Sequence, residues 1–240
     1  MSQGQLISLT IADIRRALAG PLPGVKGQIK MAPQPRTSQI NRWETSPDCR
    51  EASVLLLLYP HTTPSLGMQP PFPESEVYLV LTRRPEYPGA HSGQISLPGG
   101  RREAGESLQT TALREAHEEI GLVPTTVEVI GQLSPLYTPP SNFCIYPFVA
   151  LSATRPAFQP DPKEVAELIE LPLSLLMNPT LCKEEVWHFP NYGERRIPFF
   201  DVFGHQVWGA TAMILSEFLT LLQSRSVATS PDNHAANVAL

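Results

Sequence analysis

The stretch LPGGRREAGESLQTTALREAHEEIGL, residues 97–122, constrains the fold more than any other part of the chain. Its residues 107–120 have the periodicity of a helix, and apolar side chains recur at core spacing from Leu108 through Ala112 to Ile120. Such a helix must bury this face against other elements. The sequence therefore predicts an amphipathic helix that packs on a core and keeps its other face at the surface.

The other face of this helix is acidic. Glu115, Glu118 and Glu119 stand at positions i, i+3 and i+4, so their side chains share one side of the helix. Like charges at this spacing cost a few tenths of a kcal/mol per pair, that is, about 0.2–0.5 kcal/mol. Two interpretations remain open at this point: a solvated acidic face, or a site for a divalent cation such as Mg²⁺, which prefers oxygen ligands.

Neighbouring residues favour the cation site. Gly100 lies in a Gly-Gly turn that allows a close backbone approach and can present a carbonyl oxygen to the same metal. Arg114 lies one residue before Glu115 and near Glu118, so it can orient one carboxylate through a bidentate pair. Glu106, near the helix start, suits the helix dipole or a bond to Arg114.

The remaining pattern interleaves strands with helices. Strands are expected at 51–60, 75–85, 93–100, 125–138 and 142–153, with a hairpin at 184–191 and 195–204; helices are expected at 9–19, 163–179 with a break at Pro172, and 206–224. Consecutive strands are too close in sequence for helical crossovers. The pattern predicts an α/β fold with a mixed sheet and helices on both of its sides.

The 240 residues suit one large domain with appendages. We expect an N-terminal helix and wrapping segment at 1–48 that belongs to the same unit, a catalytic domain at 49–224, and a flexible tail at 225–240. The net charge of −5 and the scattered Lys and Arg residues argue against a nucleic-acid partner. The longest apolar run, VLLLLY, is far shorter than a membrane span of about 20 residues, so no membrane association is expected.

The three cysteines, Cys49, Cys144 and Cys182, are far apart, and no pair has metal-ligand or redox-motif spacing. The simplest interpretation is unpaired thiols in a reducing setting. The N-terminus lacks a basic region followed by an apolar run, so no signal peptide is expected. Together these features predict a cytoplasmic protein.

The spacing of the specified residues is similar to the signature of the Nudix hydrolases. From Gly100, five residues precede Glu106, and seven more precede REAHEEIGL. The resemblance implies a Nudix-type α/β/α sandwich around a mixed β-sheet. It also implies hydrolysis of a small-molecule diphosphate with Mg²⁺ or Mn²⁺ as the cofactor.

The resemblance also implies roles for individual residues. Glu115 and Glu119 would be metal ligands together with the Gly100 carbonyl, and Glu118 would join them or position the attacking water. Arg114 and Glu106 would form the supporting pair of the catalytic site, whose expected members are Glu118, Glu119, Arg114, Glu106 and Glu164. For Glu164 two roles stay open: a loop carboxylate that acts as a further ligand or base, and a carboxylate at a helix N-terminus.

Residues 80–100 resemble the upstream motif of the coenzyme A diphosphatase branch of the family. Arg84 falls at a motif position, and HSGQ resembles that branch's His-x-Gly-Gln. The candidate substrate-binding residues are Arg83, Arg84, His91 and Gln94. Gly89 stands where the motif commonly has an arginine, a natural partner for the 3′-phosphate of coenzyme A. Either Arg83, Arg84 or a distant residue makes that contact, or the substrate differs.

This resemblance implies cleavage of coenzyme A or its derivatives to 3′,5′-ADP and 4′-phosphopantetheine. The alternatives are a Nudix hydrolase of ADP-ribose or another nucleoside diphosphate derivative, and a Nudix-fold module that binds a nucleotide without hydrolysing it. The complete glutamate set argues against the last alternative. A homodimer is an open option, because many relatives are dimers.

Overall fold

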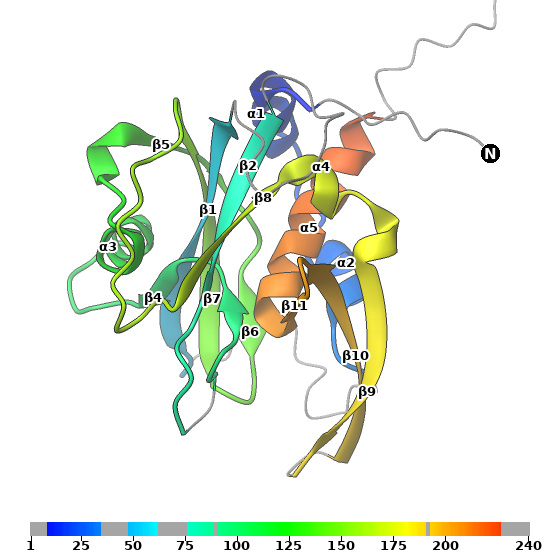
Figure 1. Cartoon of the computed structure of the whole chain (residues 1–240). Helices are drawn as coiled ribbons and strands as arrows, with labels where there is room; N and C mark the ends of the chain where they lie inside the picture. Colours follow the sequence, from blue (N-terminus) through cyan, green and yellow to red (C-terminus); the bar gives the residue numbers. More distant parts are fainter. Residues whose placement is uncertain (1–8, 35–47, 62–75, 89–90, 191–192, 227–240) are drawn as a thin grey trace, which may run out of the picture.

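A computed structural model describes residues 9–34, 48–61, 76–88, 91–190 and 193–226 (Figure 1). Its helices are α1 (Ile11–Leu18), α2 (Val25–Gln28), α3 (Leu108–Ile120), α4 (Leu173–Leu176) and α5 (Gly209–Ser226). Its strands are β1 (Arg50–His61), β2 (Glu76–Arg83), β3 (Ile95–Ser96), β4 (Gly99–Arg101), β5 (Val127–Gln132), β6 (Leu136–Thr138), β7 (Phe143–Ser152), β8 (Glu167–Pro172), β9 (Cys182–Phe189), β10 (Gly193–Val202) and β11 (His205–Trp208). Three 3₁₀ turns, η1 (Ile29–Met31), η2 (Pro124–Thr126) and η3 (Pro179–Leu181), complete the described elements.

The main sheet is mixed, as the sequence predicts. Its central path runs β3-β2-β1-β7-β5, and β4, β6 and β8 pair with β1, β7 and β2 respectively. Strands β1 and β7 are parallel, whereas the other pairs are antiparallel. The β1–β4 register sets Ser53 opposite Gly100 and Val54 opposite Gly99, so the Gly-Gly pair that was expected in a turn lies in strand β4 beside β1.

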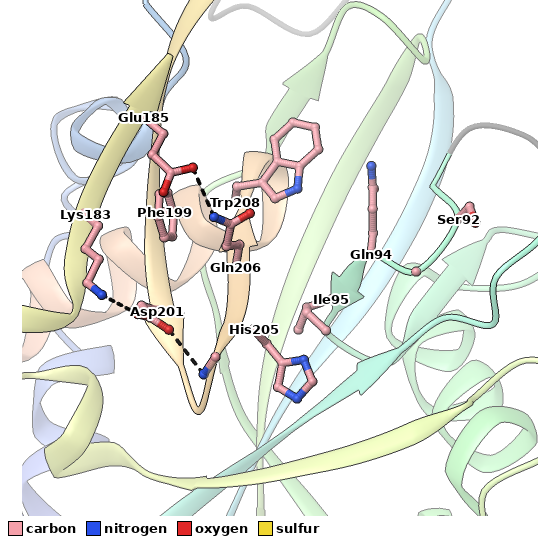
Figure 2. A pocket seen from close by; sticks show the side chains of 12 residues that line it. Ser92, Gln94, Ile95, Lys183, Glu185, Phe199, Asp201, His205, Gln206 and Trp208 are labelled. Atoms are coloured by element: carbon pink, nitrogen blue, oxygen red, sulfur yellow. Dashed lines mark hydrogen bonds and ion pairs between the residues drawn. The ribbon is translucent and has the colours of Figure 1, made fainter. Parts of the chain in front are cut away.

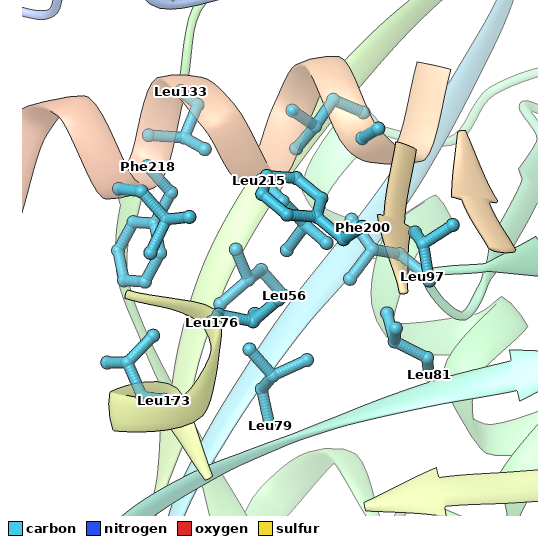
Figure 3. Close-up of a cluster of buried hydrophobic side chains, with 14 of the residues drawn as sticks. Leu56, Leu79, Leu81, Leu97, Leu133, Leu173, Leu176, Phe200, Leu215 and Phe218 are labelled. Atoms are coloured by element: carbon cyan, nitrogen blue, oxygen red, sulfur yellow. The ribbon is translucent and has the colours of Figure 1, made fainter. Parts of the chain in front are cut away.

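Helices cover both faces of this sheet (Figure 1). Leu55 and Leu57 of β1 face α3 and pack with Ala112 and Ala116 of that helix. The alternate residue Leu56 faces α5, where it packs in a larger cluster that contains Leu79, Leu81, Leu215 and Phe218 (Figure 3). This period-two alternation fixes the register of β1, because a slip of one residue would exchange the two faces.

A second, three-stranded antiparallel sheet has the order β11-β10-β9 and lies beside α5 (Figure 1). The predicted hairpin at 184–204 is therefore confirmed and gains β11 as a third strand. Ile197 and Phe199 of β10 are buried, whereas most of β9 is exposed. This sheet extends the molecule past the edge of the main sheet that carries β3.

One predicted helix is wrong in part. Residues 163–179 have helical spacing, yet Glu167–Pro172 forms strand β8, and only Leu173–Leu176 is helical. Ile169 and Leu171 are buried, and their strand pairs with β2 over six residues from Tyr78↔Pro172 to Arg83↔Glu167. The edge of β2 offers backbone partners that the local pattern does not reveal.

The cysteine prediction is also wrong for two of the three residues. Cys49 and Cys144 form a disulfide with Cα atoms 5.7 Å apart, and Cys182 is the free thiol. The parallel pairing of β1 with β7 sets Glu51 opposite Cys144 and so brings Cys49 within reach. Strand pairing therefore brings together two cysteines that are far apart in the sequence, and their spacing in the sequence does not predict this contact.

The ends of the chain are described in part. The wrapping segment after α1 is more buried than expected, since Gly27, Gln28 and Met31 are covered where α2 and η1 pack on α5. The predicted tail lies almost wholly outside the described residues, which end at Ser226. Within the part of the chain that is described, no helix has the length and apolar character needed to cross a membrane.

Candidate functional site

Local sequence signals set both ends of α3. Ser107 is the N-cap, and its hydroxyl accepts a hydrogen bond from the Thr110 N–H at 3.1 Å. Gly121 ends the helix in the left-handed conformation with φ 69°. The acidic side chains therefore project from a helix that is fixed at both ends.

Arg114 connects the start of α3 to the acidic face. Its Nε donates to Glu106 Oε1 at 2.7 Å, and its Nη2 donates to the Arg101 carbonyl at 3.1 Å. The bond to Arg114 is the main reason that the pKa of Glu106 falls to about 2, and the Thr111 hydroxyl also donates to this carboxylate. Thr111 is a supporting residue that the sequence did not single out, because a fully buried Thr in a helix has the same pattern as a core residue.

Glu118 belongs to this ion-pair network. Arg114 Nη1 donates to Glu118 Oε2 at 2.7 Å, and the Glu118 side chain is 51% exposed. The sequence predicts that Arg114 orients one carboxylate through a bidentate pair. In the structure that bidentate contact is with Glu106, whereas Glu118 receives a single bond. In this arrangement the carboxylate of Glu118 is engaged with Arg114 at the outer side of the site.

Glu115 lies directly over the Gly-Gly turn. A methyl group added at Gly100 would lie 2.5 Å from the Glu115 carboxylate, so only glycine leaves room for that group. Arg114 Nη2 lies 3.0 Å from Glu115 Oε1. Burial nevertheless raises the pKa of Glu115, because the partial loss of water outweighs the attraction of Arg114.

Glu119 is the most buried of the three glutamates, at 3% exposure. Its Oε2 accepts from the Gly99 N–H at 3.2 Å, and Arg84 Nη2 lies 3.9 Å from its Oε1. Burial raises the pKa of Glu119 to about 7 despite the opposing effects of Arg84 and Gly99. A buried carboxylate with such weak compensation is the kind of group that a cation would stabilise.

Glu164 lies in a turn before β8 and is exposed. The alternative that Glu164 lies at a helix N-terminus is wrong, because the turn leads into strand β8 and not into a helix. The charge of Glu164 raises the pKa of both Glu115 and Glu119, which means that the fold brings the three carboxylates to one region. Among the described residues, no three acidic, His or Cys side chains already enclose a metal-sized space, so the carboxylates must move closer together to share an ion.

The candidate substrate-binding residues divide between the two faces of the sheet. Arg84 approaches Glu119 on the α3 side, whereas Arg83 Nε donates to Glu167 Oε2 at 2.8 Å on the other side. His91 Nδ1 lies 2.8 Å from Gln94 Oε1, and the Gln94 carbonyl accepts from the Arg84 N–H at 3.0 Å. The His-Ser-Gly-Gln loop is thus fastened to the strand end that carries Arg84.

The sequence profile of the NUDIX domain matches residues 42–189, well over half of the chain, and includes the α3 glutamates, the Gly-Gly turn and Glu164. The chain belongs to the Nudix family. It is a Nudix hydrolase, an enzyme that acts on a diphosphate substrate. Members of this family generally use divalent metals.

Several Nudix proteins resemble the chain over most of its length. The protein named Uncharacterized Nudix hydrolase NudL from Pectobacterium atrosepticum is 34% identical over 178 residues, which cover 73% of this chain and 84% of that protein. The NudL protein of Photorhabdus laumondii is 29% identical over 82% of this chain and 94% of its own length. Among solved structures, the Nudix hydrolase RenU of M. smegmatis aligns with a TM-score of 0.47 at 16% identity, over 77% of this chain and 90% of that one.

Proposed function

We propose that this Nudix hydrolase is a metal-dependent coenzyme A diphosphatase that forms 3′,5′-ADP and 4′-phosphopantetheine. The observation that carries the proposal is the approach of Arg84 to within 3.9 Å of buried Glu119, with the His91–Gln94 loop bonded to the Arg84 backbone through the Gln94 carbonyl. These are the residues in which the chain resembles the coenzyme A branch. Arg84 therefore links the proposed substrate-recognition loop to the carboxylate region, which supports the proposal.

The residues at the site fit a Mg²⁺ or Mn²⁺ ion. Glu115 and Glu119 would hold it with the Gly100 carbonyl, and Glu118 would join them or orient the attacking water. The bound ion supplies charge neutralisation on the bridging oxygens and lowers the pKa of a coordinated water. The close approach of Glu115 to Gly100 supports this assignment, since it puts a carboxylate next to the backbone of the turn.

The other polar residues act around these ligands. Arg114 and Glu106 hold the acidic face in position through their bidentate contact. Arg84, 35% exposed, is available to pair with a substrate phosphate once a cation competes for Glu119. Glu164 would serve as a further ligand or as the base that deprotonates the water.

A substrate panel tests this function. Metal-stripped protein with added Mg²⁺ or Mn²⁺ is incubated with coenzyme A, dephospho-coenzyme A, ADP-ribose and diadenosine polyphosphates, and the products are separated by chromatography. Coenzyme A should be the preferred substrate, and Glu119→Gln should abolish turnover without loss of the folded state. Preference for ADP-ribose would assign the enzyme to the nucleoside diphosphate sugar class, and preference for dephospho-coenzyme A would exclude recognition of the 3′-phosphate.

A further inference from the structure

A polar cavity lies outside the carboxylate site, between the loop that leads into β3 and the three-stranded sheet (Figure 2). Its volume is about 520 Å³. Ser92, Gln94 and Ile95 line one side, and Lys183, Glu185, Asp201, His205, Gln206 and Trp208 line the other. In Figure 2 the side chains of Gln94 and Ser92 stand across open space from Trp208 and Gln206, with Ile95 and His205 between the two groups.

This cavity is joined to the carboxylate site through the end of β2. His205 Nε2 lies 3.4 Å from Glu167 Oε1, and Glu167 Oε2 accepts from Arg83. The next residue along the chain, Arg84, approaches Glu119 on the opposite face of the sheet. Gln94 and Gly100 are six residues apart in the chain, so their Cα atoms lie at most about 20 Å from each other. A ligand that contacts both residues needs to span no more than this distance.

The cationic side chain of the cavity, Lys183, is already paired, and the His205 ring also has an acidic neighbour. Lys183 forms an ion pair with Asp201, and His205 pairs with Glu167. Glu185 adds a further negative charge, although it accepts hydrogen bonds from Trp187 and Gln206. Because no lining cation is left uncompensated, the cavity is poorly suited to a phosphate group.

Neutral hydrogen-bonding groups remain on both sides. The Gln94 carboxamide bonds to His91 through its oxygen, and its nitrogen has no hydrogen bond to any of the described residues. The carboxamide of Gln206, the exposed residue of β11, donates to Glu185 and leaves its oxygen available. Carboxamides pair with amides as both donors and acceptors. Ile95 and Trp208 supply apolar walls, which the carbon atoms of an amide-containing ligand would contact.

Building on the proposed function, we propose that this cavity holds the uncharged, amide-containing arm of the substrate, and that the phosphorylated nucleoside lies outside it. The volume of the cavity lies within the range of about 300–1,000 Å³ that is usual for small-molecule binding clefts. A pantetheine arm is a chain of amide groups without charge. It therefore matches the polarity of the cavity, whereas the charged phosphates of 3′,5′-ADP do not.

Calorimetric binding of two substrate fragments tests this assignment without relying on turnover. Free pantetheine and 3′,5′-ADP are titrated into the wild-type protein, Gln206→Leu and the control Gln132→Leu. Gln132 is an exposed glutamine on β5, at the opposite end of the sheet. Gln206→Leu should weaken pantetheine binding about tenfold and leave 3′,5′-ADP binding unchanged. Gln132→Leu should change neither, and Gln94→Leu, from the facing wall, should reproduce the pantetheine effect.

The remaining outcomes overturn the assignment. If Gln206→Leu weakens 3′,5′-ADP and not pantetheine, the cavity holds the nucleotide. If the wild-type protein does not bind pantetheine, or the variant affects neither fragment, the cavity is not a substrate site even where coenzyme A is hydrolysed. If pantetheine binds in a Gln206-dependent way and coenzyme A is not cleaved, the proposed function fails and the cavity assignment stands.

Discussion

At the scale of single residues, the site depends on what surrounds each carboxylate more than on the number of carboxylates. Glu106, Glu115 and Glu119 are chemically the same group, yet their pKa values shift in different directions. Hydrogen bonds from Arg114 lower the pKa of Glu106, whereas burial raises the pKa of Glu115 and Glu119. One glutamate is thereby suited to hold an arginine, and the other two are suited to receive a cation.

Gly100→Ala tests the space over the Gly-Gly turn. The added methyl group would lie 2.5 Å from the Glu115 carboxylate, so that carboxylate must move. We expect kcat to fall by about a hundredfold with little change in the melting temperature, because a displacement of about 1 Å in a catalytic group costs this much.

Gly193→Ala is the matched control, since Gly193 has φ 67° and open space around it in the β9–β10 hairpin. It should lower stability slightly through backbone strain and leave kcat unchanged. Steady-state kinetics and thermal unfolding separate the two effects. A Gly100→Ala enzyme with full activity would show that Glu115 does not need its observed position.

The lowered pKa of Glu106 predicts that the folded state loses stability in acid. Its folded-state pKa of about 2 is below its ordinary value of 4.5, so the ionised form stabilises the fold. This contribution is complete above pH 4.5 and disappears as the pH falls toward 2. Glu106→Gln should therefore be less stable than wild type near pH 6, with the difference shrinking as the pH falls through this window.

Urea unfolding at several pH values measures the Glu106 effect. Glu103→Gln serves as the control, since Glu103 is an exposed neighbour whose carboxylate makes no hydrogen bond or ion pair with the described residues. It should track the wild type throughout. A gap between Glu106→Gln and wild type that stays constant with pH would mean that the carboxylate charge contributes nothing.

At the scale of elements, the sequence predicts those whose pattern is local. Helix α3 is confirmed at Leu108–Ile120 because its cap, its periodicity and its final glycine all agree. Strand β8 is missed because Leu168, Ile169 and Leu171 fit either a helix face or a buried strand, and pairing with β2 decides between them. The cavity beside β11 is also out of reach of the sequence, since its walls are separated by about a hundred residues and only the fold brings them together.

The Cys49–Cys144 disulfide makes a prediction about the β1–β7 pair. It closes a loop with a sequence separation of 95 residues and ties the residue before β1 to the second residue of its parallel neighbour β7. Its loss should lower the free energy of unfolding by about 2–4 kcal/mol, mainly because the unfolded chain gains freedom. The measurement is urea unfolding of the wild type and of the Cys49→Ala/Cys144→Ala variant, each with and without reductant.

Cys182→Ser is the control for that experiment, because Cys182 is the free thiol. It should unfold like the wild type and should remain sensitive to reductant. The double variant should be insensitive. If reductant leaves the unfolding midpoint of the wild type unchanged, the disulfide does not contribute to stability or does not form in solution.

At the scale of the whole molecule, the main sheet separates the carboxylate site from the polar cavity. The face under α3 carries the carboxylates, and the face toward α5 and β9–β11 carries the large core and the polar cavity. Arg83 and Arg84 are consecutive residues at the end of β2, and the alternation of a strand sends one to each side. In the proposed function, this arrangement lets a single substrate contact both the carboxylate site with its diphosphate and the polar cavity with its uncharged arm.

The most direct test of the account is a titration of Mn²⁺ into metal-stripped protein, with the free ion measured by electron paramagnetic resonance. Wild-type protein should bind Mn²⁺ saturably, and the Glu115→Gln/Glu119→Gln variant should lose this binding while it stays folded. Equal binding by the two proteins, or no saturable binding by the wild type, would contradict the claim that the buried carboxylates of α3 hold the catalytic cation.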